Sequence, residues 1–184
     1  SDVAFTPASF RASLEETPKF EIVDVTSQLA KLLVHKDESE MKCLVTSSSI
    51  TKTVLKKIAV PEIVKTIDSG TQVKHRDLAA MITDIFATPG KISEKLVDSP
   101  HVECGIVPAV QSGSQYSLTE VLNTEDDLHF GCILVELGSR FKSYASIVGR
   151  TYLIDSPDPV RRTYNFTVDL QARLVAMCTP GTKM

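Results

Sequence analysis

The sequence has 184 residues, of which 42% are hydrophobic and 23% are charged. It can therefore bury the core of one domain, or of one lobe and part of another. A formal net charge of −3 provides no uniform positive field that would draw the chain onto nucleic acid or an anionic membrane. The N-terminus is charged within its first turns, unlike a signal peptide, and no apolar run approaches the roughly 20 residues that cross a bilayer. We expect a soluble protein with no membrane partner.

The first 35 residues predict the edge of an α/β lobe. Residues 5–14 have the apolar spacing of a short helix, and residues 20–25 form a compact β-rich run. The character of the chain changes near residues 34–39. We therefore predict that residues 1–35 are the C-terminal edge of an N-terminal lobe with its linker, and that residues 36–184 begin a second domain.

Two helical patterns open this second domain. The first runs from Met41 to Ile58, and its predicted buried stripe is Met41, Leu44, Val45, Ser48, Leu55 and Ile58. A turn at residues 68–70 separates it from residues 75–86. This second helix places its apolar side chains on one face: Leu78, Met81, Ile82, Ile85 and Phe86.

Strands follow in residues 102–113, 129–138 and 141–155, which are rich in Val, Ile, Tyr and Phe. A third helix is predicted from Asp158 to about Cys178. The order helix, helix, sheet, helix predicts an α/β (α+β) domain with antiparallel strands and helices on one face. A sheet needs a complete layer to cover it, so we expect this chain to be part of a larger fold.

The chain offers few groups in catalytic patterns. The four cysteines lie far apart without a CxxC pair, and we interpret them as reduced packing residues of an intracellular protein. The four histidines occur singly and are interpreted as ordinary surface or interfacial residues. Ser112 lacks the glycine two positions before it that a nucleophile elbow requires, which favours a turn serine. Phosphate-binding glycine motifs are absent, and lysines 52, 56 and 57 are better explained as a solvated helix face than as a nucleic-acid site.

The hairpin at residues 134–152 carries a resemblance. Glu136-Leu137-Gly138, followed by the run from Tyr144 to Thr151, resembles the metal hairpin of the pita-bread family of aminopeptidases, prolidases and creatinase. That family has Asp-x-Gly and then Tyr-x-Ser-Asp-x-x-Arg-Thr, and the two aspartates help to hold a pair of metal ions. In this sequence the first aspartate corresponds to Glu136 and the second to Ile147.

Two further segments are similar to the same family. Residues 112–120 resemble its substrate-side segment Ser-Gly-x-Asn-x-x-x-Pro-His, so the family histidine corresponds to Glu120. Residues 36–48 resemble its entry helix. The resemblance implies a pita-bread creatinase/aminopeptidase-like fold over residues 36–184, incomplete in this chain.

The departures from the family pattern concern chemistry. An isoleucine side chain has no lone pair for a divalent ion, and Glu120 stands where the family has a proton-handling histidine. The resemblance therefore implies a pseudo-peptidase with no metal, no cofactor and no catalytic residues, in which Glu120, Glu136 and Ile147 are degenerate former active-site positions. An active metal-dependent aminopeptidase or prolidase of the same fold is the alternative.

One branch of the family has the same substitutions: the N-terminal domain of the large subunit of the histone chaperone FACT. The similar segments are residues 108–113, 129–131, 138–144 and 150–155. The branch implies a nuclear, chromosome-bound protein that binds histones and reorganises nucleosomes in transcription, replication and repair. It also implies a smaller HMG-containing or HMG-assisted subunit as a partner, bound through parts outside this chain. We hypothesise that the former active-site cleft, or the surface beside it, binds histones as peptide-like ligands; a scaffold for another nuclear factor is a further alternative.

Overall fold

The computed structural model describes residues 12, 23–96, 101–113, 116–117, 119 and 123–182. The chain divides into two compact units, Ser1–Glu38 and Ser39–Met184. Within the described part of the first unit lies helix α2 (Thr26–Val34), which the sequence patterns did not predict. The helix predicted at residues 5–14 lies outside the described residues except for Ala12, and residues 23–25 of the predicted β-rich run have no regular structure. The assignment of residues 1–35 to a lobe edge stays a prediction.

A long helix runs from Glu38 to Ser69 with one irregular turn. It consists of α3 (Glu38–Val54), the π-helical turn η1 (Leu55–Ala59) and α4 (Val60–Ser69). Pro61, at the start of α4, has no N–H and its ring crowds the carbonyl four residues earlier, which accounts for the wider turn just before it. Gly70 ends the helix with a φ of 62°, a left-handed conformation that glycine adopts without steric cost.

The predicted buried stripe of this helix is wrong in its first half. Met41 is 48% exposed and Val45 is 64% exposed. The residues of α3 that are buried are Ser47, Ile50, Thr51 and Val54. Two of these, Ser47 and Thr51, are polar, and their hydroxyls form hydrogen bonds with Ser139 of the sheet.

The second predicted helix is confirmed as α5 (His75–Ile85). Leu78, Ile82 and the following Phe86 are buried, while Met81 and Ile85 are partly buried against the same core. Two short 3-10 turns follow, η2 (Pro89–Lys91) and η3 (Glu94–Leu96). A membrane-spanning helix would need to be longer and more apolar than any in the described part of the chain.

Three antiparallel strands form one sheet in the order β1 (Val102–Gln111), β2 (Gly131–Phe141) and β3 (Tyr144–Ile154). Phe141 pairs with Tyr144, so the β2–β3 hairpin turns through two residues, Lys142 and Ser143, both with positive φ. Consecutive positive φ values are those of a type I′ turn, whose twist matches the flanking strands. The three predicted strands and the hairpin are confirmed, but the turn lies later than predicted: Phe141, predicted in the third strand, ends β2.

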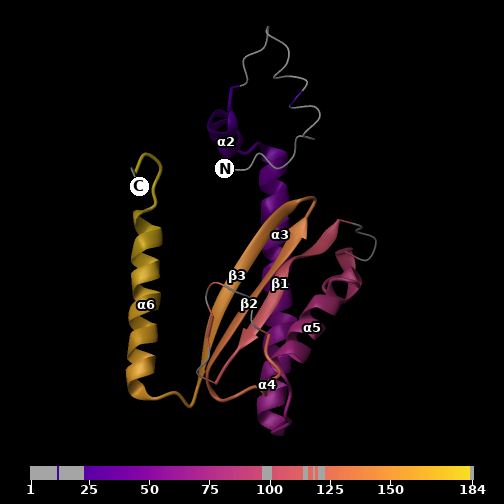
Figure 1. The fold of residues 1–184 in the computed structure, drawn as a ribbon, viewed down its shortest axis with the longest axis vertical. Coiled ribbons are helices and arrows are strands. Elements are labelled where there is room, and N and C mark those ends of the chain that lie inside the picture. The colour runs from indigo at the N-terminus through magenta and orange to yellow at the C-terminus, as the bar shows by residue number, and fades with distance from the viewer. Residues whose placement is uncertain are drawn as a thin grey trace. The chain divides into compact units, whose positions relative to one another are not determined.

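The two faces of this sheet have different surroundings. Helices α3 and α5 lie on one side of it (Figure 1), where Ile133, Val135 and Leu137 of β2 are fully buried. The last helix, α6 (Asp158–Met177), has no buried residue. It stands on the other side of the sheet as a separate column (Figure 1). The predicted mixed α/β class, with helices packed on one face of an antiparallel sheet, is confirmed.

Candidate functional site

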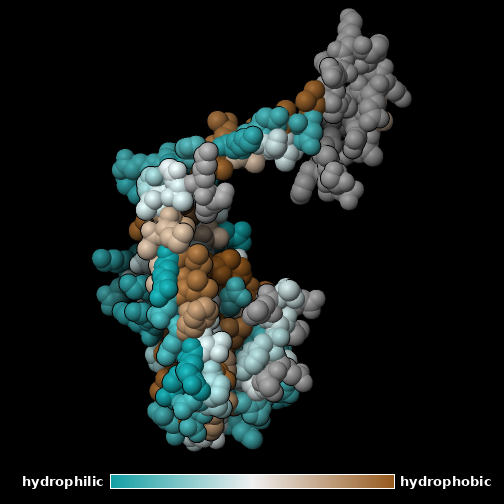
Figure 2. Space-filling model, turned by 90° about the vertical axis from the view of Figure 1, so that its left-hand side faces the viewer, coloured by the Kyte–Doolittle hydropathy of each residue, from teal (hydrophilic) through white to brown (hydrophobic). Residues whose placement is uncertain are grey.

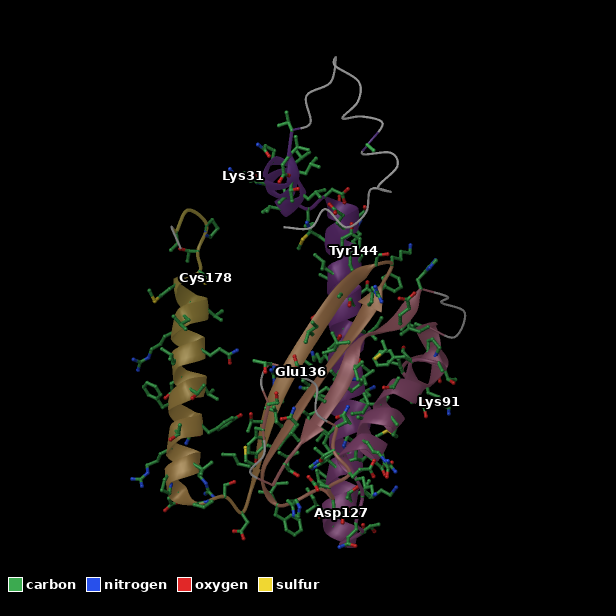
Figure 3. The ribbon with its side chains drawn as sticks, viewed as in Figure 1. Lys31, Lys91, Asp127, Glu136, Tyr144 and Cys178 are labelled. Atoms are coloured by element: carbon green, nitrogen blue, oxygen red, sulfur yellow. The ribbon has the colours of Figure 1, made fainter. Side chains whose placement is uncertain are left out.

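The two hairpin positions that correspond to the family's aspartates lie on the same face of the sheet. Glu136 pairs with Gly149, and Ile147 pairs with Gly138, so they are diagonal neighbours, two residues apart along β3. Side chains alternate along a strand, and the neighbours of Glu136 in β2, Val135 and Leu137, are buried in the helix-covered core. Glu136, which is labelled in Figure 3, and Ile147 therefore project from the opposite face, which we call the open face.

Small residues flank Glu136 on the open face. Ala109 lies opposite it on β1 and Gly149 opposite it on β3. A Cβ added to Gly149 would meet no atom within 4 Å. The carboxylate is partly buried, and it forms no hydrogen bond or ion pair with any residue that the structure describes. This part of the face leaves room for a ligand group to reach the carboxylate.

Ile147 packs over a glycine rather than standing in a polar site. A Cβ added to Gly138 would lie 3.1 Å from Cγ1 of Ile147 and 3.2 Å from Cγ1 of Ile106. The isoleucine therefore covers the backbone of β2, although 53% of its surface remains exposed. Its role in the structure is apolar contact across the strands.

These positions offer a poor donor set for metal ions. A pair of divalent ions needs several oxygen or nitrogen ligands, whereas Glu136 contributes one carboxylate and Ile147 contributes hydrocarbon. No cluster of three or more His, Cys, Asp or Glu side chains that could hold a metal occurs among the described residues. The third predicted position, Glu120, lies outside the described residues. Of the three predicted positions, the structure therefore brings together Glu136 and Ile147.

The helix-covered face is held by a buried hydroxyl cluster centred on Ser139. The Thr51 Oγ1 lies 2.8 Å from Ser139 Oγ and accepts the Ser139 N–H at 3.1 Å. The Ser139 hydroxyl donates to the Ser47 carbonyl at 2.8 Å, and the Ser47 hydroxyl donates to the Ser139 carbonyl at 2.9 Å. These three residues are at most 1% exposed. The cluster fixes β2, and with it Glu136, against α3.

Gly105 allows β1 to approach this cluster. A Cβ at that position would lie 2.7 Å from the backbone C and O of Ser139, closer than packed atoms come. The pairing of β1 with β2 is also irregular between Cys104 and Ala109, as at a β-bulge. The sheet is therefore most tightly constrained on both sides of Ser139.

His75 is a functional candidate, and its interpretation as a surface or interfacial residue is wrong. Its side chain is 2% exposed, and both ring nitrogens are hydrogen-bonded to hydroxyls. Burial lowers the pKa of its imidazole below the usual 6.5. The available signal was its spacing: His75 lies three, four and seven residues before Leu78, Ala79 and Ile82, on the buried face of α5.

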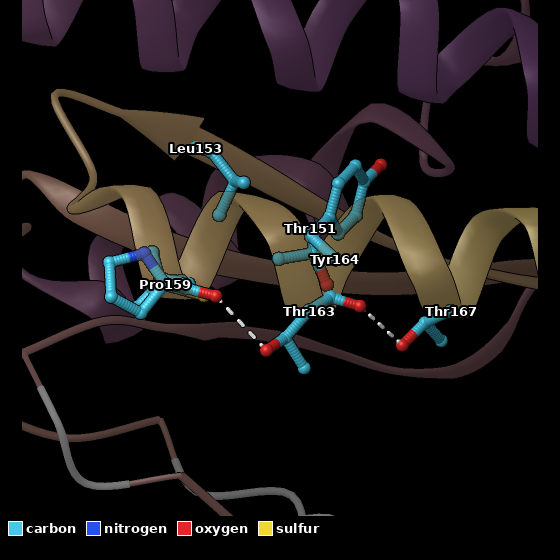
Figure 4. Close-up of a pocket in the computed structure, with 8 residues that line it drawn as sticks. Thr151, Leu153, Pro159, Thr163, Tyr164 and Thr167 are labelled. Atoms are coloured by element: carbon cyan, nitrogen blue, oxygen red, sulfur yellow. Dashed lines mark hydrogen bonds between the residues drawn. The ribbon is translucent and has the colours of Figure 1, made fainter.

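A hollow separates the open face from α6. One pocket of about 400 Å³ is lined by Cys132, Thr151 and Leu153 of the sheet and by Pro159, Val160, Thr163, Tyr164 and Thr167 of α6 (Figure 4). The Thr163 and Thr167 hydroxyls donate to the carbonyls of Pro159 and Thr163, each at 3.0 Å. Because these hydroxyls are satisfied within the helix, the pocket wall is largely apolar.

Apolar side chains of α6 also remain exposed on the side of the molecule that carries this helix (Figure 2). Examples are Phe166 at 67% and Leu174 at 54%. Exposed apolar surface of this extent is typical of a face that meets another polypeptide.

Residues 42–184 match the family model described as Metallopeptidase family M24. FACT complex subunit SPT16 of Dictyostelium discoideum is 38% identical over 172 residues, which are 93% of this chain but 16% of that relative. This chain thus spans about a sixth of the curated relative's length.

Solved structures show the same fold. The N-terminal domain of FACT complex subunit SPT16 from Cicer arietinum matches with a TM-score of 0.86 at 24% identity, over 95% of this chain and 42% of that one. The X-Pro aminopeptidase of Thermotoga maritima matches with a TM-score of 0.66 at 14% identity, over 91% of this chain and 44% of that one. The predicted pita-bread aminopeptidase-like fold, and the resemblance to the N-terminal domain of the FACT large subunit, are confirmed.

Proposed function

The chain belongs to Metallopeptidase family M24, and from this premise we propose that it is a non-catalytic, histone-binding module of a FACT large subunit. The observation that carries the proposal is its similarity to FACT complex subunit SPT16 over nearly its whole length. The proposed partners are histones, and the proposed location is the nucleus, on chromosomes. The smaller HMG-containing subunit would be bound by other parts of the full protein, during transcription, replication and repair.

The absence of catalysis is supported by the donor set on the hairpin. Glu136 retains a carboxylate, but its diagonal neighbour on β3 is Ile147, which cannot ligate a metal or stabilise a developing charge. We propose that no metal pair is held here and that no peptide bond is cut. The degenerate positions Glu120, Glu136 and Ile147 would then be remnants of a hydrolase site.

The open face is the proposed surface for an extended basic polypeptide. Glu136 presents a carboxylate without an ion-pair partner among the described residues, beside the small residues Ala109 and Gly149. The pocket next to it, shared by the sheet and α6, is lined by the apolar residues Leu134 and Val168, by polar residues such as Thr151 and Gln171, and by Arg150. A carboxylate with apolar side chains nearby suits a lysine or arginine side chain, whose charged head and aliphatic stem need both.

Titration of core histone dimers and tetramers onto the chain tests the proposal. We expect saturable binding at micromolar or lower concentration, and no binding in that range rejects the histone-binding role. Glu136→Lys should weaken binding by roughly tenfold, about 1.4 kcal/mol, by placing like charge against a basic ligand. Glu94→Lys is the matched control, because Glu94 is exposed and belongs to η3 rather than to the open face of the sheet.

The rival function is an active aminopeptidase or prolidase of the same fold, favoured by the match to the family model and to an X-Pro aminopeptidase. It predicts hydrolysis of X-Pro or Met-leading peptides with manganese or cobalt. Our proposal predicts no metal-dependent turnover by the wild-type chain. Any turnover that chelation abolishes and added metal restores overturns it.

A further inference from the structure

His75 joins three elements through a single side chain. It is the first residue of α5; its Nε2 lies 2.6 Å from Ser112 Oγ, just after β1, and its Nδ1 lies 2.8 Å from Thr124 Oγ1 in the loop before β2. Ser112 is 5% exposed. The imidazole therefore bridges a helix, a strand end and a loop in a site that is almost closed to water.

Backbone hydrogen bonds tie the same loop to the start of α5. The His75 N–H donates to the Asp126 carbonyl at 3.0 Å, and the Leu128 N–H donates to the Val73 carbonyl at 2.8 Å. The His129 N–H donates to Ser112 Oγ at 2.9 Å. Residues 124–129 are thus anchored to the helix and to the strand end through groups that surround one ring.

The hydrogen-bond pattern fits a neutral ring. Each hydroxyl already accepts a backbone N–H, Ser112 Oγ from His129 at 2.9 Å and Thr124 Oγ1 from Asp126 at 3.3 Å. In a neutral imidazole one ring nitrogen can accept a hydroxyl proton while the other donates. In the imidazolium both nitrogens carry protons, so both hydroxyl oxygens would have to accept from the ring as well as from the backbone, and neither hydroxyl proton could be donated to the ring in this buried site.

We propose that His75, Ser112 and Thr124 form an acid-sensitive clamp that holds residues 124–129 against α5 and the end of β1, and that opens when the imidazole is protonated. The clamp is closed at neutral pH, when the imidazole is neutral. It opens in mild acid, because the cation cannot make the same set of bonds.

The charged groups around the ring shift the pKa of His75 in opposite directions. Burial is the largest influence and lowers the pKa of His75; His129 lowers it further, whereas Asp126 and Asp127 raise it. Glu125 is engaged in ion pairs with Lys74 and Arg76 at the start of α5. The net shift is downward, so the unfolded chain binds a proton at higher pH than the folded chain. The stability contributed by the clamp is present above pH about 6.5 and is lost as the pH falls from there through the lowered pKa.

Opening of the clamp would change a surface pocket beside it. Gly113, Tyr116, His129, Phe130, Cys132 and Val160 line a hollow of about 580 Å³, and Phe130 is 63% exposed. A Cβ added to Gly113 would lie 2.7 Å from the His129 ring, so this wall is closely fitted. Release of His129 from Ser112 would move part of the pocket lining.

The test is nuclear magnetic resonance of the 184-residue chain between pH 8 and pH 5. Ring ¹⁵N shifts report the tautomer and titration of His75, and amide exchange at Asp126, Leu128 and His129 is expressed as protection factors, which remove the intrinsic pH dependence of exchange. We expect a neutral ring at pH 8. The protection factors should fall as the ring gains its proton, with the same midpoint as the ring titration.

Variants separate the clamp from a general effect of acid. His75→Gln keeps a donor and an acceptor but does not titrate, so its protection factors should not depend on pH; His101→Gln, at an exposed histidine, should behave as the wild type. The proposal is overturned if wild-type protection is constant while His75 titrates, or if it is lost at a midpoint different from that of the ring. It is also overturned if a folded His75→Gln variant loses amide protection with falling pH as the wild type does.

Discussion

The two faces of the sheet are built from the same strands and have opposite properties. On the helix-covered face even the polar residues Ser47, Thr51 and Ser139 are buried and hydrogen-bonded. On the open face Ile147 is half exposed, and helix α6 buries no residue. The covered face therefore maintains the fold, whereas the open face is available for contact with other polypeptides. Substitutions matched between the two sides can test this division.

The largest contrast is expected for leucines on the two sides. Leu137→Ala on the covered face removes a side chain that is 0% exposed, and should lower the free energy of unfolding by about 2–5 kcal/mol through lost burial and a residual cavity. Leu174→Ala on α6, where the side chain is 54% exposed, should change it by about 0.5 kcal/mol or less. Urea unfolding curves measure both. Equal losses would show that the open side is as tightly packed as the covered one.

Glycines provide the next contrast. Gly105→Ala forces a Cβ to within 2.7 Å of the Ser139 backbone, and we expect a loss of about 1–3 kcal/mol from overpacking. Gly149→Ala on the open face meets nothing within 4 Å and should be nearly neutral. Thermal unfolding midpoints compare the two variants, and a stable Gly105→Ala protein would contradict the close approach of β1 to β2.

The hydroxyl cluster gives a contrast of similar size between two threonines of a single helix. Thr51→Val keeps the shape of the side chain but leaves the buried Ser139 N–H without its acceptor, at a cost of about 1–3 kcal/mol. Thr53→Val is the control, because the Thr53 hydroxyl bonds only the Ser49 carbonyl one turn earlier. The difference between the two free energies of unfolding measures the contribution of the cluster. A difference near zero would show that the hydroxyl cluster does not stabilise the fold.

The smallest effect on stability is expected on the open face at the former ligand position. Ile147→Asp restores the carboxylate of the family pattern at a half-exposed site and should change the free energy of unfolding by no more than about 1 kcal/mol. We also expect no manganese-dependent hydrolysis of X-Pro peptides, because a single restored carboxylate does not complete a two-metal site. Turnover by this variant would show that the rest of the catalytic apparatus is intact.

The parts of the fold that depend on local pattern could be predicted from the sequence. The apolar spacing in α5 and the β-branched runs of the strands predicted those elements, and Asp158 and Pro159 marked the start of α6. The register of the hairpin was not predicted, because β2 runs to Phe141 and the turn lies at Lys142 and Ser143, beyond the predicted end of the second strand at residue 138.

The parts that depend on distant partners could not be predicted. Ser47 and Thr51 are buried because Ser139, about ninety residues away in the chain, satisfies their hydroxyls. The apolar residues that were predicted to be buried in α3, such as Met41 and Val45, therefore lie on its exposed side. His75 is buried for the same kind of reason, since its partners Ser112 and Thr124 come from other segments. Helix α2 has an apolar spacing at Leu29, Leu32 and Leu33 but no buried residue, and this short pattern was not recognised as a helix.

The most direct test of the central claim combines binding and cleavage in one titration. Histone tetramers are titrated onto the chain by calorimetry with manganese present, and the recovered histones are then measured by intact-mass spectrometry. For a non-catalytic histone-binding module we predict saturable binding with histones of unchanged mass. We also predict the same affinity when a chelator replaces manganese. The absence of binding, or histones shortened only when manganese is present, would contradict it.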